Sequence, residues 1–264
     1  MATAVICEFN PFHNGHKYLL ESAKNVLKEP VIAIMSGSFT QRGEVAVCDK
    51  FVRAKSALEN GADLVLELPV VFSLSGAEGF AKAGVAIASA FECTNHLAFG
   101  SESGDCELLK KSANAVCDER VQALVRDGMK NGGYYPRELE NAVKTVFGDE
   151  ISSVLCEPNN ILGVEYIKAL NGTGVEPFSV ARTGVAHDCR IAGKGFASAS
   201  HIREMLRNGE NAKKYAPYIP DEITFPENFD RPLLYRLRTM TREDIAKLPD
   251  VGEGCLLYTS PSPR

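Results

Sequence analysis

The segment Glu8-Phe9-Asn10-Pro11-Phe12-His13-Asn14-Gly15-His16 decides how this chain folds. It follows a short apolar run, residues 4–7, of the kind expected for a buried parallel strand that ends at a ligand-binding edge. A helix should begin at about Lys17, because apolar residues then recur at helical spacing as far as Pro30. The segment therefore predicts a strand, a polar loop and a helix in succession.

The same unit of strand and helix repeats along the first hundred residues. We expect helices over residues 49–60 and 77–89, and further strands over residues 31–35, 64–68 and 96–99. Strands that alternate with helices in this way predict an α/β fold, in which a Rossmann-like parallel sheet is covered on both faces. Ligands of such sheets bind beyond the carboxyl ends of the strands, where this chain has polar and glycine-rich loops.

The remainder of the chain alternates less regularly. Residues 106–147 have the pattern of helices without a confident strand, which predicts a helical insertion. A helix over 161–170, a short strand over 178–181 and a helix over 198–206 follow. We therefore expect a sheet domain over residues 1–206 and the start of a C-terminal helical region over residues 207–254.

Composition restricts the classes of function. With 264 residues, 45% of them apolar, the chain can bury a sizeable core. No window reaches the roughly 18 uninterrupted apolar residues of a membrane span, and the N-terminus lacks the pattern of a secretory signal. We therefore expect a cytoplasmic protein with no membrane partner. The eight cysteines lack metal-ligand spacing, so we expect free thiols.

His13 and His16 are the strongest candidates for catalysis. They lie close to a predicted helix entrance, where free backbone N–H groups and the helix dipole favour a phosphate. Imidazoles placed there can donate to oxygens that gain charge when a carboxylate attacks the α-phosphate of ATP, and Gly15 lets the backbone approach a nucleotide. Alternatively, the two histidines only cap the helix or lie exposed. A metal site would need a third ligand, and none is evident.

A second motif, Ser198-Ala199-Ser200-His201-Ile202-Arg203, combines a hydroxyl-rich helix start with an arginine. A guanidinium matches phosphate geometry, so Arg203 is a candidate to bind the β- and γ-phosphates of the leaving pyrophosphate. Strings of this kind often only cap helices, and the motif alone is weak evidence.

These two motifs carry a resemblance to a known family. Residues 8–16 resemble the nucleotide motif of the tRNA(Met) cytidine acetate ligases, and residues 198–203 resemble the second signature of the HxGH nucleotidyltransferases. Five further segments agree with that family in order, namely residues 35–44, 49–54, 61–69, 99–102 and 158–163. The resemblance implies a Rossmann-like sheet of the HxGH nucleotidyltransferase type with a helical insertion and a truncated C-terminal helical region.

The resemblance also implies an ATP-dependent ligase that works in two steps. Acetate and ATP, with Mg²⁺, would give acetyl-adenylate and pyrophosphate, and the acetyl group would then pass to N4 of the wobble cytidine of elongator tRNA(Met). His13, His16 and Arg203 would be the catalytic residues. The ATP contacts that carry over are Ile6, Cys7, Glu8, Phe9, Asn10, Pro11, Phe12, His13, Asn14, Gly15, His16, Lys17, Tyr18, Leu19, Gly100, Asn159, Arg182, Ser198 and Ser200. Asn160 is an alternative to Asn159.

Several other polar and aromatic residues leave two interpretations open. The candidates to hold acetate, tRNA or phosphates just past the second strand are Gln41, Arg42, Lys50 and Arg53, and the alternative is a solvated face. The pair Tyr134-Tyr135 would stack on an unpaired base or pack in a core. For His187-Asp188 we expect a surface loop.

Two rival functions are compatible with parts of the sequence. One is another adenylate-forming ligase of the same superfamily, of the pantothenate synthetase type, although the segments 41–44 and 158–160 favour the acetate ligases. The other is a non-catalytic ATP-binding regulatory module, against which His13, His16 and Arg203 count. Consumption of ATP in the presence of acetate would distinguish the module from a ligase.

The last ten residues, 255–264, depart from the family. They resemble the translation of a sequencing adapter, and we expect a scar rather than a native tail rich in Ser and Pro. In that case the natural protein continues beyond this chain. Residues 201–250 hold nine Lys or Arg and nine Asp or Glu, which gives no basic stripe for tRNA. We therefore expect the tRNA contacts in that continuation.

Overall fold

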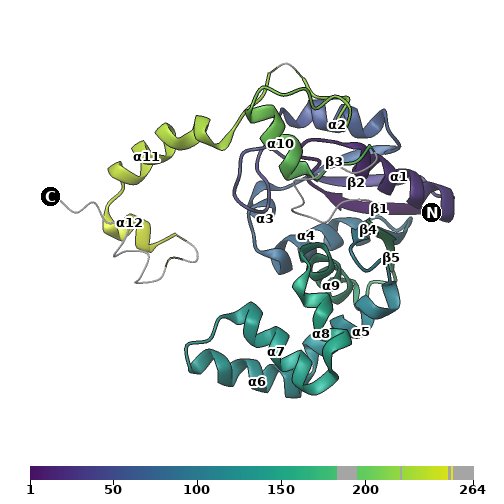
Figure 1. The fold of residues 1–264 in the computed structure, drawn as a ribbon, viewed down its shortest axis with the longest axis vertical. Helices are drawn as coiled ribbons and strands as arrows, with labels where there is room; N and C mark the ends of the chain where they lie inside the picture. Colours follow the sequence, from purple (N-terminus) through teal and green to yellow (C-terminus); the bar gives the residue numbers. More distant parts are fainter. Residues whose placement is uncertain (183–194, 221, 249–250, 252–264) are drawn as a thin grey trace. The chain divides into compact units, whose positions relative to one another are not determined.

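The computed structural model describes residues 1–182, 195–220, 222–248 and 251. The chain divides into two compact units, Met1–Ile223 and Thr224–Arg264 (Figure 1). His187, Asp188 and the last ten residues, for which the sequence made predictions, lie outside the described residues. Within the described part of the chain, no helix combines the length and the apolar character that a bilayer crossing requires.

A parallel sheet of five strands forms the centre of the first unit (Figure 1). Its strands are β1 (Ala2–Cys7), β2 (Val31–Ser36), β3 (Leu64–Leu68), β4 (Thr94–Ser101) and β5 (Glu176–Ala181). Their order is β3-β2-β1-β4-β5, and every neighbouring pair is parallel. The predicted Rossmann-like α/β fold is therefore confirmed. Because the chain proceeds outward on both sides of β1, the order reverses between β1 and β4, where such sheets form their ligand crevice.

Helices cover both faces of the sheet, as its apolar strands require. On one face, Val5 and Ala33 pack with Leu20 of α1 (Asn14–Leu27) and Ala57 of α2 (Lys50–Leu58). On the other face, strand residues such as Ile6 pack with α4 (Ala77–Ala90) and α9 (Pro158–Leu170). Alternate residues of β1 thus enter different cores, which is the period of a strand. The short helix α3 (Val70–Ser73) joins β3 to α4.

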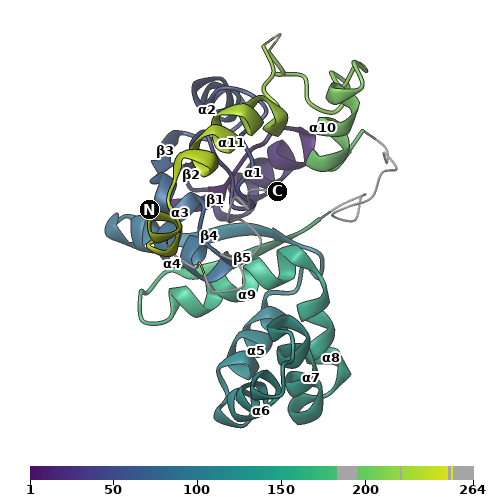
Figure 2. The ribbon, with the colours of Figure 1, turned by 90° about the vertical axis from the view of Figure 1, so that its left-hand side faces the viewer.

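Four helices and a 3₁₀ turn occupy the chain between β4 and α9 and form a group beside the sheet (Figure 2). They are α5 (Cys106–Cys117), α6 (Glu119–Lys130), α7 (Tyr135–Phe147), α8 (Asp149–Ser153) and the turn η1 (Val154–Cys156). Buried apolar side chains of α5, α6 and α7, among them Leu109, Val121 and Val143, belong to the same core as α4 and α9. The helical pattern of residues 106–147 corresponds to α5, α6 and α7.

Helix α1 begins earlier than the sequence predicted. We expected its start at about Lys17, and it begins at Asn14. The reason is a side-chain cap: Nδ1 of His13 accepts a hydrogen bond from the backbone N–H of Gly15, at 3.0 Å. Histidine is not among the residues that usually cap helices, so the apolar periodicity alone placed the start one turn late.

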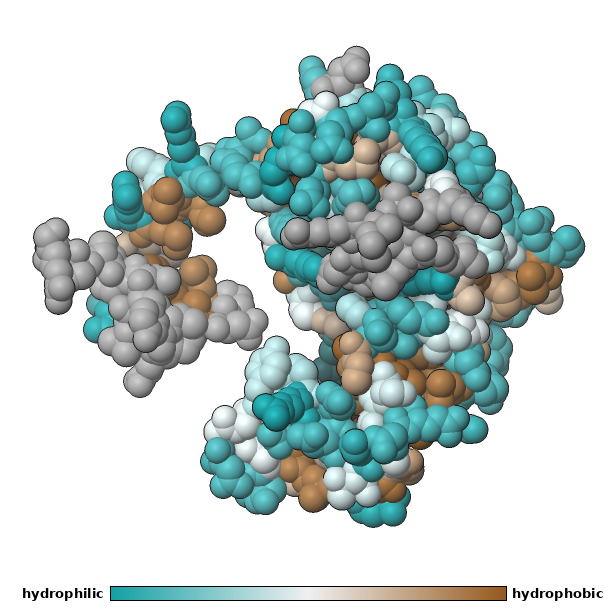
Figure 3. All heavy atoms as spheres, in the orientation of Figure 1, coloured by the Kyte–Doolittle hydropathy of each residue, from teal (hydrophilic) through white to brown (hydrophobic). Residues whose placement is uncertain are grey.

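The first unit ends with α10 (Ala199–Arg207) and a short irregular segment that packs on it. Ile202 of α10 is fully buried against Ala212 and Ala216. This packing brings residues 207–223, which we had placed in the helical region, into the first compact unit. The second unit contains the 3₁₀ turn η2 (Pro226–Phe229), α11 (Asp230–Thr239) and α12 (Arg242–Ala246). On the face drawn in Figure 3, mainly polar residues cover the upper part of the first unit.

Candidate active site

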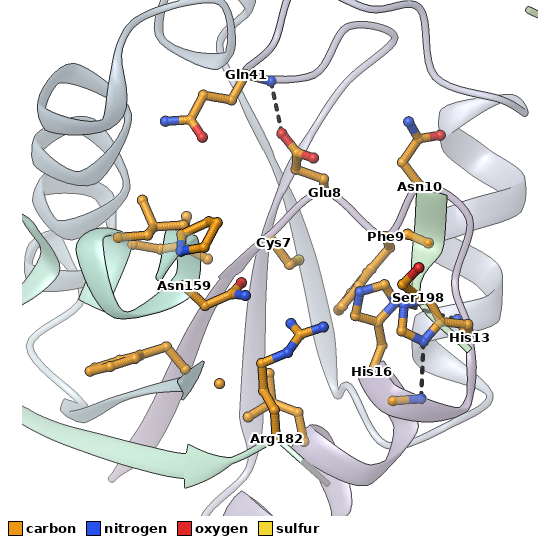
Figure 4. Close-up of a pocket in the computed structure, with 18 of the residues that line it drawn as sticks. Cys7, Glu8, Phe9, Asn10, His13, His16, Gln41, Asn159, Arg182 and Ser198 are labelled. Atoms are coloured by element: carbon orange, nitrogen blue, oxygen red, sulfur yellow. Dashed lines mark hydrogen bonds between the residues drawn. The ribbon is translucent and has the colours of Figure 1, made fainter. Parts of the chain in front are cut away.

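A cavity of about 290 Å³ lies beyond the carboxyl ends of three strands (Figure 4). Cys7 at the end of β1, Gly100 near the end of β4 and Ala181 at the end of β5 all line it. Its location is the one that the strand order dictates, next to the reversal between β1 and β4. Gly100 lies next to the stem of Arg182, since an added Cβ would be 3.5 Å from its Cγ, an ordinary contact distance.

Three helices direct their N-terminal ends at this cavity. Gly15 of α1, Asn159 of α9 and the pair Ser198 and Ser200 at the start of α10 are lining residues. The N-terminus of a helix carries a partial positive charge and free N–H groups, which together favour an anion. The cavity is therefore built for a ligand with negative charge spread over several groups.

The rings of His13 and His16 stack against each other on one wall, with their centroids 3.7 Å apart (Figure 4). Nδ1 of His13 accepts from Gly15, and Nδ1 of His16 accepts from the backbone N–H of His13 at 3.3 Å. A ring nitrogen that accepts carries no proton, so in each neutral ring the proton is on Nε2. The structure thus shows that both histidines cap α1 and also line the cavity. The two interpretations of these residues do not exclude each other.

Burial keeps both imidazoles neutral. It lowers the pKa of His13 to about 3, and the nearby Arg182 and Arg203 act in the same direction. Burial also lowers the pKa of His16 well below its usual value, assisted by His13 and Arg182. Neutral rings with Nε2–H groups are hydrogen-bond donors to a phosphate without being its counterions.

The neutral His13 predicts a pH dependence of stability. The unfolded chain binds a proton at this histidine below pH 6.5, whereas the folded chain does so only near pH 3. The free energy of unfolding therefore decreases as the pH is lowered through this window, by about 1.4 kcal/mol per pH unit for one such group. Urea unfolding at pH 7 and at pH 5 measures how much free energy of unfolding is lost between the two. We expect this loss to be larger by about 2 kcal/mol in wild type than in His13→Asn, which retains a capping oxygen. Equal losses would contradict a neutral His13.

Gly15 lines the cavity and in addition makes room for the neighbouring imidazole. An added Cβ would lie 2.8 Å from Cε1 of His13, so the absence of a side chain makes room for that imidazole. Gly15→Ala is expected to lower activity about tenfold or more by displacing the ring, while the helix gains roughly 1 kcal/mol of intrinsic propensity. Melting temperature and catalytic rate, measured on the same sample, test this prediction. Gly76→Ala is the control, because an added Cβ there meets no atom within 4 Å. Full activity of Gly15→Ala would contradict it.

Arg182 supplies a second cation-bearing side chain to the cavity wall, beside Arg203. Its backbone N–H donates to the carbonyl of Ser101 at 2.9 Å, which holds it at the end of β5, and its guanidinium points into the cavity (Figure 4). Among the described residues, none forms a hydrogen bond or ion pair with this guanidinium. Burial lowers its pKa, and Glu102 opposes that effect. A desolvated cation without a partner is a site for an anionic ligand.

Arg203 reaches the cavity from α10 and is more constrained. Its Nη1 donates to the carbonyl of Asn10 at 2.8 Å, and its Nη2 lies 3.5 Å from Oγ of Ser200 and 3.7 Å from a carboxylate oxygen of Glu44. Ser198 caps α10 through a bond from the N–H of His201, so the capping interpretation of this motif also holds. Arg203 therefore ties α10 to the loop after β1 and still lines the cavity.

The packing of α9 directs Asn159 and Asn160 to different surroundings. Asn159 lines the cavity, and its side-chain amide donates to Oε1 of Glu102. Asn160 is 4% exposed, and its Oδ1 accepts from the backbone N–H of Ser103 at 3.1 Å. Glu102 was not among the predicted contacts, although it ends one of the segments that carry the resemblance.

Not every predicted contact lies at the cavity. The structure places Ile6, Cys7, Glu8, Phe9, Asn10, His13, Gly15, His16, Tyr18, Leu19, Gln41, Arg42, Gly100, Asn159, Arg182, Ser198, Ser200 and Arg203 on its wall. It does not bring Pro11, Phe12, Asn14, Lys17, Lys50 and Arg53 there. Phe12 packs on Phe9, Asn14 donates to the carbonyls of Gly195 and Lys214, and Lys17 pairs with Glu21.

Two of the remaining candidates have structural partners elsewhere. Lys50 forms an ion pair with Glu67 at 2.7 Å, and Arg53 is buried among backbone carbonyls. Tyr134 and Tyr135 are 73% and 47% exposed, so they do not pack in a core. The sequence analysis missed the apolar part of the wall, which Phe80, Phe99, Leu162, Tyr166 and Phe196 provide, because periodicity does not show which core residue borders a cavity.

Metal-binding groups are not evident in the described part of the chain, where no three His, Cys, Asp or Glu residues are arranged to hold an ion. Glu8 is the one carboxylate among the described lining residues, and its Oε1 accepts from the backbone N–H of Gln41 at 2.8 Å. The described cysteines are free thiols. Burial raises the pKa of Cys48 to about 11 and raises that of Cys7 well above its usual value, so neither is a thiolate at neutral pH.

Comparison with known proteins supports the resemblance inferred from the motifs. The model of the HIGH Nucleotidyl Transferase family matches residues 1–256. The tRNA(Met) cytidine acetate ligases of Caldanaerobacter subterraneus subsp. tengcongensis and Clostridium tetani are 38% and 35% identical to this chain over 96% of its length. The chain spans 67% and 68% of those two proteins, which is about two thirds of their length.

Solved structures give the same result. Apo TmcAL of Thermotoga maritima matches with a TM-score of 0.89 and 33% identity, over 98% of this chain and 67% of that one. The same protein bound with alpha-thio ATP matches with a TM-score of 0.87 and 33% identity, over 98% of this chain and 66% of that one. On these matches, this chain belongs to the HIGH nucleotidyl transferase family and, within it, to the tRNA(Met) cytidine acetate ligases.

Proposed function

We propose that the cavity binds ATP and activates acetate as acetyl-adenylate. The observation that carries this proposal is the convergence of the Arg182 guanidinium, two neutral imidazoles and three helix N-termini on one cavity. These groups suit a triphosphate, which offers several charged oxygens at once. The relative solved with alpha-thio ATP shows that a protein of this fold accepts such a nucleotide.

In the first step, an acetate oxygen forms a bond to the α-phosphorus and the bond from that phosphorus to the bridging oxygen of the β-phosphate breaks. We assign the Nε2–H groups of His13 and His16 to the phosphate oxygens that gain charge. Arg203, with the hydroxyls of Ser198 and Ser200, binds the departing pyrophosphate. Mg²⁺ comes with the nucleotide and is held mainly by its phosphates and by water, a coordination that this ion prefers.

The rest of the nucleotide is held from the strand ends. We propose that Arg182 binds a phosphate, that Gly100 leaves space beside it, and that Asn159 rather than Asn160 contacts the nucleotide. Gln41 and Arg42 line the same cavity and are the candidates for acetate or for the incoming tRNA. Lys50 and Arg53 are not, because their polar groups already have partners.

In the second step, N4 of the wobble cytidine of elongator tRNA(Met) attacks the acetyl carbon and AMP leaves. We retain residues 1–206 as the proposed ATP-binding domain, with its insertion at 106–147, and residues 207–254 as the start of a helical region. A tRNA substrate implies a cytoplasmic protein. Residues 201–250 hold as many acidic as basic residues and so give no basic stripe, which is why we expect this chain to acetylate tRNA weakly.

Acetate-dependent exchange of labelled pyrophosphate into ATP tests the first step without tRNA. We expect exchange with ATP, Mg²⁺ and acetate, and none without a carboxylate. Exchange with pantoate but not acetate would favour a ligase of the pantothenate synthetase type. ATP binding without exchange would favour a regulatory module. A parallel tRNA acetylation assay against a full-length relative tests the second step, and equal rates would show that the tRNA contacts lie within this chain.

A further inference from the structure

Arg53 is a buried cation that the proposed reaction does not use. It lies on α2 and is 1% exposed. Among the described residues it is the largest side chain that is fully buried. Removing an arginine from water is costly unless its donors are satisfied. No ion pair with a carboxylate is formed by Arg53 within the described residues. The hydrogen-bond partners of this guanidinium therefore indicate the function of Arg53.

Its partners are four backbone carbonyls, one at the end of β2 and the others in two separate loops. Nε donates to Cys48 at 3.2 Å, and Nη1 donates to Glu8 at 2.6 Å and to Ser36 at 3.1 Å. Nη2 donates to Gly37. Four of the five N–H groups of a guanidinium are thus used, in the fixed planar fork that this group provides.

The two loops meet at the cavity. Residues 37–48, the 37–48 loop, fold back on themselves through a hydrogen bond from Ala46 to Ser38 and an antiparallel bridge between Phe39 and Val45. Gly37 and Cys48 are the two ends of this loop, and Arg53 binds both. Gln41 and Arg42, between those ends, line the cavity.

The other partner, Glu8, lies in the loop after β1 that bears the histidines. Two further bonds join this loop to the 37–48 loop: Oε1 of Glu8 accepts from Gln41 at 2.8 Å, and Oδ1 of Asn10 accepts from Val47 at 2.7 Å. Phe9 between them has a φ of 48°, a conformation that costs energy for a residue with a side chain. Such a conformation persists only where neighbouring contacts hold it, and Arg53 supplies the contact next to it.

We propose that Arg53 is a positioning residue that anchors both ends of the 37–48 loop to the Glu8 carbonyl, so that Gln41 and Arg42 face the reacting groups. Arg53 acts through these backbones and does not touch the substrates. The kinetic part of the test rests on the proposed function, but the anchoring itself does not. A lysine cannot replace it, because an ammonium has three donors at one point and cannot reach four carbonyls in a plane.

The experiment compares Arg53→Lys and Arg53→Ala with wild type. Hydrogen exchange followed by mass spectrometry measures peptides from the 37–48 loop and from β2. We expect exchange in the 37–48 loop, which contains the Gln41 and Val47 amides, to become clearly faster while β2 stays protected. In the same variants, kcat of acetate-dependent pyrophosphate exchange is expected to fall about 10²-fold, because residues around the reacting groups are displaced. The KM for ATP should change less. Guanidinium ions added to Arg53→Ala should restore part of both signals.

Arg120→Lys is the matched control, since Arg120 is an exposed arginine of α6 that pairs with Asp118. Unchanged protection of the 37–48 loop in a folded Arg53→Lys would overturn the proposal, and so would an unchanged kcat. If both variants lose protection throughout the sheet, Arg53 serves folding as a whole and the proposal fails. If wild type shows no acetate-dependent exchange, the proposed function fails, while hydrogen exchange still decides whether Arg53 anchors the loop.

Discussion

His16→Ala is expected to lower acetate-dependent pyrophosphate exchange by about 10²–10³-fold, the loss usual for a donor aimed at developing charge. The physical reason is the Nε2–H group of His16. Its Nδ1 accepts a hydrogen bond from the backbone N–H of His13, so in the neutral ring the proton is on Nε2. Because His16 belongs to the first turn of α1 and to neither core of the sheet, its replacement should leave the sheet folded. His13→Ala should have a similar kinetic effect and in addition lose a helix cap worth about 1 kcal/mol.

Since both histidines also cap α1, a matched pair of variants must separate capping from catalysis. Asn at the first position and Gln three residues later form a normal capping box, so His13→Asn and His16→Gln preserve the cap while removing the imidazoles. We expect thermal stability close to wild type and exchange as low as in the alanine variants. His96→Ala, which removes an imidazole bound to Glu29 outside the cavity, is the control. Restored exchange in His16→Gln would mean that only the cap matters.

Arg182→Ala is expected to weaken ATP binding by about 10- to 100-fold, which corresponds to the roughly 1.5–3 kcal/mol of a hydrogen bond to a charged group. The folded chain itself should lose little stability, because this guanidinium has no partner among the described residues and its burial is a cost. Calorimetric titration with a non-hydrolysable ATP analogue and a thermal melt of the unliganded protein measure the two effects.

Arg182→Lys separates charge from geometry at the same position. If the contact to phosphate is bidentate, the lysine variant recovers only part of the affinity. Arg120→Ala, at an exposed site on α6, should bind the analogue as wild type does. Unchanged affinity in Arg182→Ala would refute the assignment and leave the helix N-termini as the source of phosphate binding.

The layers of the fold and the family could both be predicted from local patterns in the sequence. The apolar run of residues 31–35 matches a strand that is buried on both faces, and Asp49 and Ser198 cap helices, as is usual for residues of their type. These features depend on neighbours within a few residues, which is why a linear pattern contains them. The same holds for the motif of residues 8–16, whose loop lies between β1 and α1.

Which polar residues share the cavity depends on contacts between separate segments of the chain. Arg42, Arg182 and Arg203 come from three distant segments and reach it, whereas Arg53, with equal charge, turns inward to four carbonyls. Neighbours in sequence also separate, as Asn159 lines the cavity and Asn160 holds Ser103. The direction of a side chain on a helix depends on what packs against that helix. The parallel sheet brings those partners together from separate segments, as with Glu8 for Arg53 and Ser103 for Asn160, and no local pattern records such a contact.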